Sequence, residues 1–428
     1  MKRILLISYA FPPNASAGAV RSERFARYLP KFGWGVDVIT ICRRRDMYQD
    51  ENRLHTLGPN VSVSFTRSPD PWLWLRDKKP NNIMMRATRS ALMQLFSFPD
   101  HMLLWIPFAV KSGLDILKKK RNRAIYSTSP PHSSHLAGLF LSRMTGIPWI
   151  ADFRDPWSLN TYHDGYRVKK VSREMERFLE TKVYQSASAI LANTNSNRLN
   201  VLKAFPFQDE KKVIHVPNTW ENFPIECIPK ERKNNPLTIV HAGTFYPRFK
   251  PYSLLYALAS WRDGKKPREV PPLEKKDVKV ILLGAKDEKT AEVVRDLRLT
   301  DLVEARPWVS LNAARKIMCE ADFLWASLGT GIQSRTFLPS KLFEYIAAEK
   351  PILGFFADGE ASNLIREGQV GTVFTEENHD AVIRKIYEGM CAKKQGESIE
   401  YHANQELIKS YHIERVAEKL ADVLNHLA

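Results

Sequence analysis

The chain has 428 residues, of which 44% are hydrophobic, and its Gly and Pro contents are ordinary. This length and composition exclude a single small domain and a disordered or low-complexity chain, so two or three globular domains are expected. Lys and Arg exceed Asp and Glu by 64 to 47, which gives a net charge of +17 and predicts an anionic partner.

The four cysteines are far apart and form no CxxC pair, which argues against a disulfide framework and against a zinc site. A basic pair and a short apolar run open the chain, but Pro12 and Pro13 follow at once, so we interpret the start as a β-strand and not as a signal peptide. No apolar run approaches the roughly 18 residues that span a bilayer. We therefore expect a cytoplasmic protein.

Short apolar runs alternate with helical patterns, which is typical of doubly wound α/β domains with buried parallel sheets. In the first half, apolar residues at helical spacing predict amphipathic helices at about 18–32 and 172–186. The strands predicted there are 4–8, 36–41, 61–65, 124–128, 149–153 and 189–193.

Basic and bulky apolar residues are interleaved from 84 to 123, where the run ends in LKKKRNR. This mixture suits an anionic membrane surface, at which each Lys or Arg contributes about 1 kcal/mol. A solvated helix end with its apolar residues in the core explains the pattern equally well. No nucleic-acid-binding module is recognisable, so nucleic acid is not an expected partner.

A polar, proline-bearing run at 218–236 lacks periodicity and is the predicted linker between a domain at 1–217 and a domain at 237–395. A helical segment with an apolar stripe follows at 396–428, and the pattern leaves open which domain it covers. The strands predicted in the second half are 238–243, 278–284, 303–308, 322–327 and 352–356.

Doubly wound sheets bind ligands beyond the carboxyl ends of their strands. After the first strand, Gly18 opens a helix and Arg21 lies on its first turn, where free amides and the helix dipole favour an anion. Helices that simply pack closely begin in the same way. After the strand at 238–243, Arg248 and Lys250 could hold a diphosphate, although a solvated basic loop would have the same composition.

One carboxylate, Glu344, lies in an apolar helix that begins near Ser340, the predicted N-cap. An unpaired charge in such a helix costs several kcal/mol, roughly. Lys341 lies three residues earlier on the same face and could pair with Glu344. Alternatively, Glu344 binds paired sugar hydroxyls while the helix amides face a phosphate.

Five motifs in this order resemble those of the retaining GT-B glycosyltransferases of family 4, over nearly the whole chain. They are AGAVR (17–21), DFRDPW (152–157), HAGTFYPRFK (241–250), LPSKLFEYIAAEKPIL (338–353) and DGEASNLIREG (358–368). The resemblance implies an α/β fold of two Rossmann-like doubly wound domains that face each other across a cleft. The first would bind the acceptor and the second a nucleotide-diphosphate sugar, and a C-terminal helix would cross back to the first domain.

Carried over by position, the resemblance makes Glu344 the residue that binds the donor ribose and Lys250 the diphosphate-binding lysine, helped by Arg248. Thr244 stands where the family often has arginine, directly after Gly243. The family's first acidic residue, which is separated by seven residues from the ribose-binding glutamate, is also absent, because Thr336 occupies that place.

The resemblance places further residues at the donor or the acceptor. Gly18, Arg21, Gly243, Thr244, Ser340, Lys341, Leu342 and Glu360 are expected near the donor. His132 would approach the transferred sugar, with His135 as its rival, and Asp155 would orient the acceptor. For each of these residues a purely structural role is the alternative.

The function that the resemblance implies is transfer of a sugar, with retention, to a lipid-linked or membrane-associated glycan in surface polysaccharide biosynthesis. The protein would lie on the inner face of the cytoplasmic membrane. No cofactor or metal is expected, because we find no DxD in a suitable loop and no His cluster with ligand spacing. A sugar-nucleotide epimerase of the same fold and a non-catalytic membrane-surface binding protein are the alternatives.

Overall fold

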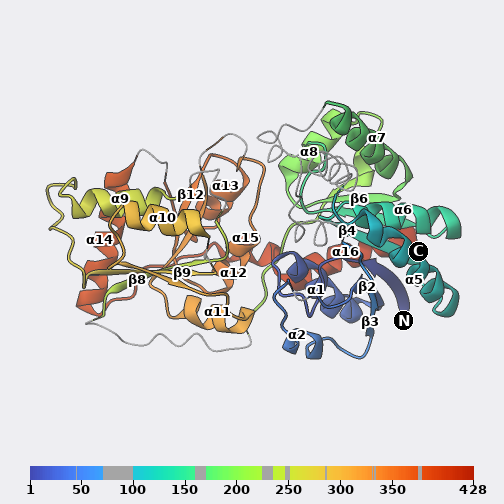
Figure 1. The fold of residues 1–428 in the computed structure, drawn as a ribbon, viewed down its shortest axis with the longest axis horizontal. Coiled ribbons are helices and arrows are strands. Elements are labelled where there is room, and N and C mark those ends of the chain that lie inside the picture. Colours follow the sequence, from blue (N-terminus) through green and yellow to red (C-terminus); the bar gives the residue numbers. More distant parts are fainter. Residues whose placement is uncertain are drawn as a thin grey trace, which may run out of the picture. The chain divides into compact units, whose positions relative to one another are not determined.

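A computed structural model describes residues 1–44, 46–70, 100–159, 170–223, 235–245, 251–284, 287–329, 331, 334–374 and 378–428. The chain forms two compact units (Figure 1). The first comprises Met1–Pro217 together with Ile413–Ala428, and the second comprises Asn218–His412. Most of the predicted linker, and residues 84–99 of the basic and apolar stretch, lie outside the described residues.

The first unit is built on a seven-stranded sheet in the order β3-β2-β1-β4-β5-β6-β7, in which all neighbouring strands are parallel. Its strands are β1 (Lys2–Ile7), β2 (Trp34–Ile41), β3 (Val61–Thr66), β4 (Ala124–Ser129), β5 (Trp149–Phe153), β6 (Ala189–Ala192) and β7 (Val213–His215). The strands β2, β4 and β5 are buried along their whole length because both faces of a parallel sheet are covered.

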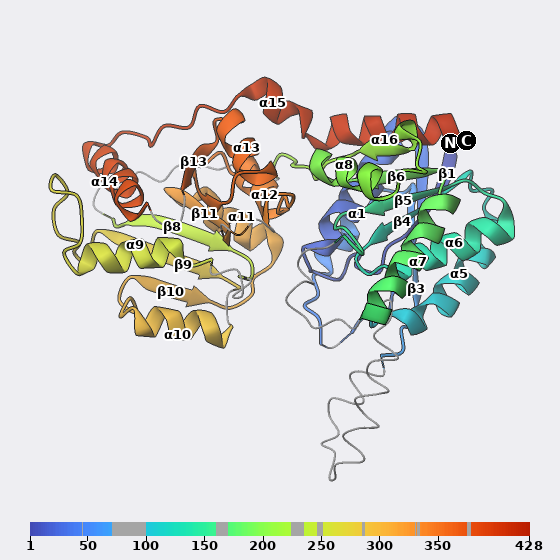
Figure 2. The same cartoon turned by 90° about the horizontal axis from the view of Figure 1, so that it is seen from above.

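The helices of the first unit lie on both faces of this sheet (Figure 2). They are α1 (Gly18–Tyr28), η1 (Leu29–Phe32), α2 (Asn52–His55), η2 (Leu103–Trp105), α5 (Ile106–Lys119), α6 (Ser133–Thr145), α7 (Lys170–Ser186), α8 (Asn195–Ala204), η4 (Glu210–Lys212) and α16 (Ile413–Leu427). Leu5 and Ile7 of β1 join a core with α5, α6 and α7, whereas Ile4 and Leu6 join a core with α1 and α16. The C-terminal helix thus covers the N-terminal sheet, as the fold prediction requires.

The second unit is built on a six-stranded parallel sheet in the order β10-β9-β8-β11-β12-β13. Its strands are β8 (Leu237–Ala242), β9 (Val278–Leu283), β10 (Val303–Arg306), β11 (Phe323–Gly329), β12 (Ile352–Phe356) and β13 (Gly371–Phe374). Its helices are α9 (Ser253–Arg262), α10 (Glu288–Asp296), α11 (Leu311–Cys319), α12 (Lys341–Ala347), α13 (Glu360–Glu367), α14 (His379–Gln395) and α15 (Gln405–Ser410).

Three details differ from the sequence predictions. The helix expected at 18–32 is α at first and changes to the tighter η1, which has Pro30 in its first turn. The short strands β7 and β13 were not predicted. Among the cysteines, Cys42 and Cys391 carry free thiols but Cys319 is disulfide-bonded, which the spacing of the cysteines did not indicate.

Part of the LKKKRNR run is structural. Lys120 and Asn122 donate hydrogen bonds of 2.7 and 2.9 Å to the buried carboxylate of Asp37 on β2. Arg3 binds the same carboxylate through two further bonds, and these partners together hold the pKa of Asp37 well below its usual range, although burial alone would raise it. Two polar residues of the run therefore stabilise the sheet and are not available to a membrane.

Each sheet reverses its strand order at one point, between β1 and β4 in the first unit and between β8 and β11 in the second. In open α/β sheets, ligands bind outside the carboxyl ends of the strands at such a point. Ligands are therefore expected at the loops after β1 and β4, and after β8 and β11.

Candidate functional site

In the second unit, helix α12 is fixed against the carboxyl ends of β8 and β11. The Tyr345 hydroxyl accepts a hydrogen bond of 2.8 Å from the backbone N–H of Ala242 and donates one of 3.1 Å to the carbonyl of Trp325. The large apolar and aromatic residues of α12, including Leu342, are buried. This packing leaves Lys341 and Glu344, which are half-buried, beside the loop that follows β8.

Gly243 forms the turn after β8 with a φ of +106°, a value that favours glycine. The ammonium of Lys341 lies near this turn, 3.5 Å from the carbonyl oxygen of Thr244. A Cβ atom built on Gly243 would lie 3.6 Å from the Lys341 Nζ, so the glycine is required for backbone conformation and not for space. Gly243 and Thr244 are both exposed, and the lysine is thus placed to meet an anion at the turn.

His241, the last residue but one of β8, receives the Lys341 ammonium. Its Nδ1 lies 2.9 Å from the carbonyl of Trp325 and must donate, because a carbonyl only accepts; its Nε2, 3.3 Å from the Lys341 Nζ, is then an acceptor. Burial, and then the charge of Lys341, lowers the pKa of His241 well below its ordinary value, and burial lowers the pKa of Lys341 to about 8. The Lys341 ammonium is therefore mostly charged at pH 7 and loses its proton as the pH rises through about 8, while His241 stays neutral.

Glu344 is balanced by a residue that the sequence did not suggest. Its Oε2 accepts a hydrogen bond of 3.0 Å from the Nε of Arg315 on α11, and the Nη2 of the same guanidinium lies 3.1 Å from the Oε1 of Glu221. Arg315 is buried, so this is a desolvated, charge-assisted contact. The expected alternative of a Lys341–Glu344 ion pair is replaced by an Arg315–Glu344 pair.

Two other residues predicted for this region, Ser340 and Glu360, lie at the starts of helices α12 and α13. Ser340 stands at the N-cap of α12, but its side chain makes no capping bond, since its φ and ψ are already helical whereas a capping residue is extended. Glu360 begins α13 and its backbone N–H bonds to the carbonyl of Arg335 at 2.8 Å. Gly359 precedes it in close contact with Arg335, whose carbonyl oxygen would lie 2.2 Å from an added Cβ.

In the first unit, Arg21 is part of a buried network and not of an open anion site. Its Nε and Nη2 donate to both oxygens of the Asp152 carboxylate at 2.9 and 2.8 Å, and its Nη1 and Nη2 also reach the carbonyls of Pro217 and Val216. Asp152 additionally accepts from the hydroxyl of Tyr126 at 2.7 Å. The prediction that Arg21 adds charge for a donor phosphate therefore competes with this structural use of its donors.

Gly18 is contacted by Arg154. The Arg154 guanidinium donates to the carbonyl of Gly18 and, at 2.8 and 2.6 Å, to those of Ser129 and Pro130. It thus joins the loops that follow β1, β4 and β5 at the point where the strand order reverses. A Cβ on Gly18 would lie 3.2 Å from the guanidinium, which explains the glycine. Burial lowers the pKa of Arg154, and the charge of the half-buried Asp155 offsets part of this effect.

His132 and its rival His135 have different surroundings. The ring of His132, at the N-cap of α6, stacks parallel on Trp157 of the DFRDPW motif with centroids 4.6 Å apart. His135 is fully buried, its Nδ1 lies 2.8 Å from the hydroxyl of Ser127, and burial lowers its pKa to about 3. His135 is therefore a neutral core residue, whereas His132 lies at the loop that follows β4.

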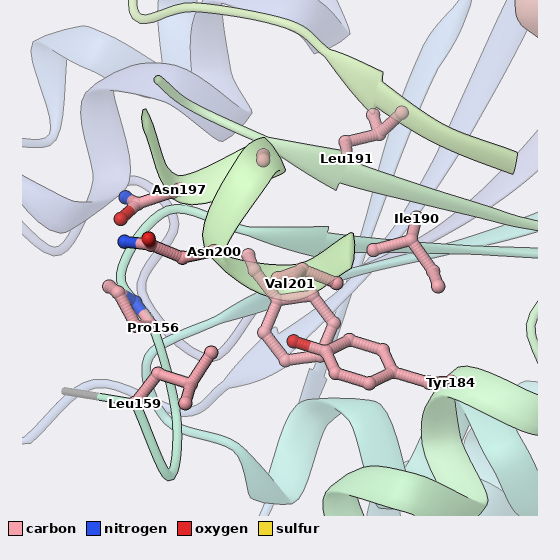
Figure 3. A pocket seen from close by; sticks show the side chains of 10 residues that line it. Pro156, Leu159, Tyr184, Ile190, Leu191, Asn197, Asn200 and Val201 are labelled. Carbon is pink, nitrogen blue, oxygen red and sulfur yellow. The ribbon is translucent and has the colours of Figure 1, made fainter. Parts of the chain in front are cut away.

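A small, mainly apolar pocket lies at the carboxyl ends of β5 and β6 (Figure 3). In Figure 3, the amides of Asn197 and Asn200 from α8 lie close together on one side, and the ring of Tyr184 lies across from them. None of the residues predicted for the site lines this pocket. The lining residues are Phe153, Pro156, Leu159, Tyr184, Ile190, Leu191, Ala192, Asn197, Asn200 and Val201.

The predicted diphosphate-binding pair, Arg248 and Lys250, lies outside the described residues. Within the second unit the structure brings Gly243, Thr244 and Lys341 together, and it supports Glu344 with Arg315. Sequence reasoning missed Arg315, Glu221 and His241. Only His241 carried a signal, because it is a polar residue at the end of an otherwise apolar strand.

Comparison with known proteins agrees with this architecture. A family model described as a glycosyl transferase 4-like domain matches residues 16–219. No curated protein matches.

Solved structures match over the whole chain at low sequence identity. Sucrose-phosphate synthase from Thermosynechococcus elongatus is 14% identical with a TM-score of 0.65, covering 100% of this chain and 99% of that one. HepE from Anabaena, in complex with UDP and glucose, is 15% identical with a TM-score of 0.66 and full coverage of both chains. WaaG, a glycosyltransferase involved in lipopolysaccharide biosynthesis, is 13% identical with a TM-score of 0.61, covering 98% and 99%.

No helix within the described ranges is both long and apolar enough to cross a membrane. In that same part of the chain, no three His, Cys, Asp or Glu side chains are grouped so that they could hold a metal ion. The two parallel sheets, the returning C-terminal helix and the full-length structural matches identify the fold as GT-B. The chain is therefore a GT-B-fold protein whose residues 16–219 match the glycosyl transferase 4-like domain family.

Proposed function

We propose that this protein is a glycosyltransferase that takes a sugar from a nucleotide-diphosphate donor bound in its second unit. The observation that carries the proposal is the arrangement on α12, where Lys341 lies beside the Gly243 turn and Glu344 is held by a buried arginine. One short helix thus presents a cation for a diphosphate and a carboxylate for paired hydroxyls. The complexes of HepE with UDP and with UDP-glucose agree with such a donor.

In the proposed complex, Glu344 accepts hydrogen bonds from the ribose hydroxyls of the donor. A carboxylate has two oxygens and about four acceptor positions, so the bond from Arg315 to Oε2 is compatible with hydroxyl donors on the same carboxylate. The diphosphate lies at the exposed Gly243 turn beside Lys341, and Arg248 and Lys250 supply further charge. Glu360, at the start of α13, is a further candidate donor contact.

The chemical step is cleavage of the bond between the sugar and the diphosphate, which leaves negative charge on the phosphate oxygen. A positioned ammonium stabilises that charge more in the transition state than in the ground state, which is how such a group accelerates bond breaking. We propose that Lys341, Arg248 and Lys250 do this without a metal ion. Retention follows if the departing phosphate takes the proton of the incoming hydroxyl on the same face.

The acceptor is proposed to bind the first unit. His132 and Asp155 lie in the loops after β4 and β5, at or beside the carboxyl edge where the strand order reverses. A lipid-linked or membrane-associated glycan suits the net charge of +17, which favours an anionic surface on the inner face of a cytoplasmic membrane. Surface polysaccharide assembly is the proposed context, which agrees with the involvement of WaaG in lipopolysaccharide biosynthesis.

The proposal is tested in two steps. A thermal-shift screen of UDP, GDP, ADP and their sugars identifies the donor, because a ligand that binds only the folded chain raises its melting temperature. Turnover is then measured with the selected donor and a panel of membrane-extracted glycolipids. Lys341→Met is expected to lower kcat by roughly 10² to 10³ if the ammonium acts in the transition state.

The exposed Lys316 on α11 provides a matched control, and Lys316→Met should keep the activity of the unaltered chain. Full turnover in Lys341→Met would contradict the site. Release of an epimerised donor without any acceptor would identify an epimerase instead. Donor binding without turnover against the whole panel would favour a non-catalytic binding protein.

A further inference from the structure

Arg315 is shared by two carboxylates that come from distant parts of the chain. Its Nε bonds to Glu344 on α12 and its Nη2 to Glu221, which lies close to the point where the chain enters the second unit at Asn218. The Arg315 and Glu221 side chains are 5% and 7% exposed, and that of Glu344 is 12% exposed. Arg315 also lies over the ring of Phe223, 4.8 Å from its centroid.

The segment around Glu221 is itself fixed to the end of the second unit. The indole N–H of Trp220 donates to the carbonyl of Ile408 at 2.7 Å, and its backbone N–H donates to the carbonyl of Tyr411 at 3.2 Å. The Trp220 ring packs edge-on against His412, with centroids 4.7 Å apart. The segments through which the chain enters and leaves this unit therefore lie side by side.

The departing segment also contacts α12. The ring of Tyr411 lies 5.6 Å from that of Phe343, the residue directly before Glu344. The entering segment reaches the same helix through Glu221 and Arg315. Helix α12, which carries the proposed ribose-binding carboxylate, is thus connected to both segments that lead to the first unit.

The shape of the arginine side chain explains how a change at Glu221 can reach Glu344. A guanidinium is planar and rigid, so its Nε and Nη2 cannot turn independently toward two carboxylates. A displacement of Glu221 rotates the whole fork and changes the angle at which Nε meets Oε2 of Glu344. Because hydrogen bonds weaken steeply with misalignment, the orientation of the Glu344 carboxylate follows the position of Glu221.

We infer that Arg315 is a positioning residue that orients Glu344 toward the donor ribose and, through Glu221, couples ribose binding to the chain segments that connect the two units. This inference rests on the proposed function, because it requires a nucleotide whose ribose binds Glu344. Arg315 itself is not assigned a contact with the nucleotide. Its effect is on the geometry of Glu344.

The test compares UDP and GDP with their 2′,3′-dideoxy forms by isothermal titration calorimetry. The dissociation constant of the dideoxy form divided by that of the hydroxylated form measures the contribution of the ribose hydroxyls. A variant that only loosens the fold weakens both forms alike and leaves this ratio unchanged. For the nucleotide that binds, the unaltered chain should prefer the hydroxylated form by about tenfold or more, as expected for hydrogen bonds to a charged group. Glu344→Gln should bring the ratio close to one.

Two conservative variants test Arg315. Arg315→Lys keeps the charge but loses the fork, and Glu221→Gln keeps the shape but loses the charge; each should lower the ratio at least about threefold. Lys316→Gln, on the neighbouring position of α11, should leave the ratio unchanged. Melting curves confirm that each variant is folded, and if Arg315→Lys does not fold, Glu221→Gln decides alone.

The outcomes separate this inference from the proposed function. An unaltered ratio in Arg315→Lys and Glu221→Gln, with the ratio lost in Glu344→Gln, overturns the positioning role and leaves the ribose site intact. A ratio that falls in Arg315→Lys alone overturns the coupling through Glu221. An unaltered chain that does not distinguish the dideoxy forms overturns the ribose contact at Glu344, and the inference with it.

Discussion

Raising the pH should weaken nucleotide-sugar binding, because it removes the proton from Lys341. Burial lowers the pKa of this lysine to about 8 in the free protein. A diphosphate bound beside the ammonium favours its charged form and therefore raises the pKa in the complex. Binding above pH 8 must then take up a proton, so the affinity falls as the pH rises through the pKa of the free protein.

The size of the effect follows from this pKa. Between pH 7 and pH 9 the charged fraction of Lys341 in the free protein falls from about nine-tenths to about one-tenth for a pKa near 8. If the bound diphosphate restores the ordinary value of 10.5, the lysine stays charged in the complex over this range. The dissociation constant should therefore rise about tenfold between pH 7 and pH 9.

Calorimetry with UDP-glucose, or with the sugar nucleotide selected by the screen, measures the dissociation constant at several pH values. Repeating the titration in buffers of different ionisation enthalpy gives the number of protons taken up on binding. Lys341→Met should bind more weakly at pH 7 and lose both the pH dependence and the proton uptake. Neighbouring His241 does not contribute, because its pKa lies well below this range. Binding without proton uptake in the unaltered chain, or a pH slope that persists in Lys341→Met, would refute the reasoning.

Three further predictions concern stability. Asp152→Asn removes the carboxylate partner of the buried Arg21 and should lower the unfolding free energy by about 3 to 5 kcal/mol. Denaturant titrations measure this change, and a midpoint like that of the unaltered chain would contradict the network. Burial raises the pKa of Glu180 from 4.5 to about 7. The carboxyl of the unfolded chain releases its proton first, so the unfolding free energy should fall as the pH rises from 4.5 to 7. Glu180→Gln should abolish this fall, and a variant with the same pH dependence would count against the role of Glu180. Gly359→Ala forces a Cβ against the Arg335 carbonyl and should lower the unfolding free energy by about 1 to 3 kcal/mol. In thermal melts the control Gly58→Ala, whose Cβ meets nothing within 4 Å, should change the melting temperature little. Equal melting temperatures of the two variants would disprove the close contact.

Much of the fold could be predicted because its signals are local. The strands at 4–8 and 36–41 are apolar runs of strand length, and the observed β1 and β2 differ from them by no more than two residues at either end. The strand β7 escaped prediction because it has three residues, VIH, which are too few to establish a pattern.

The site was harder to predict because its partners are distant in sequence. Glu344 could be predicted as a site residue because it is a lone acid in an apolar helix. Its partner Arg315 is 29 residues away, and Glu221 is 94 residues from Arg315, so neither could be predicted from a local pattern. Likewise, Arg21 at a helix start suggested an anion site, whereas its carboxylate partner, Asp152, is 131 residues away. Pairings of this kind are decided by the packing of the sheets, which no local pattern specifies.

A crystal structure of the full chain with bound UDP is the most direct test of the central claim. The account predicts ribose hydroxyls within hydrogen-bonding distance of the Glu344 carboxylate and a diphosphate between the Gly243 turn and the Lys341 ammonium. A nucleotide bound elsewhere, with no contact between its ribose and Glu344, would contradict it.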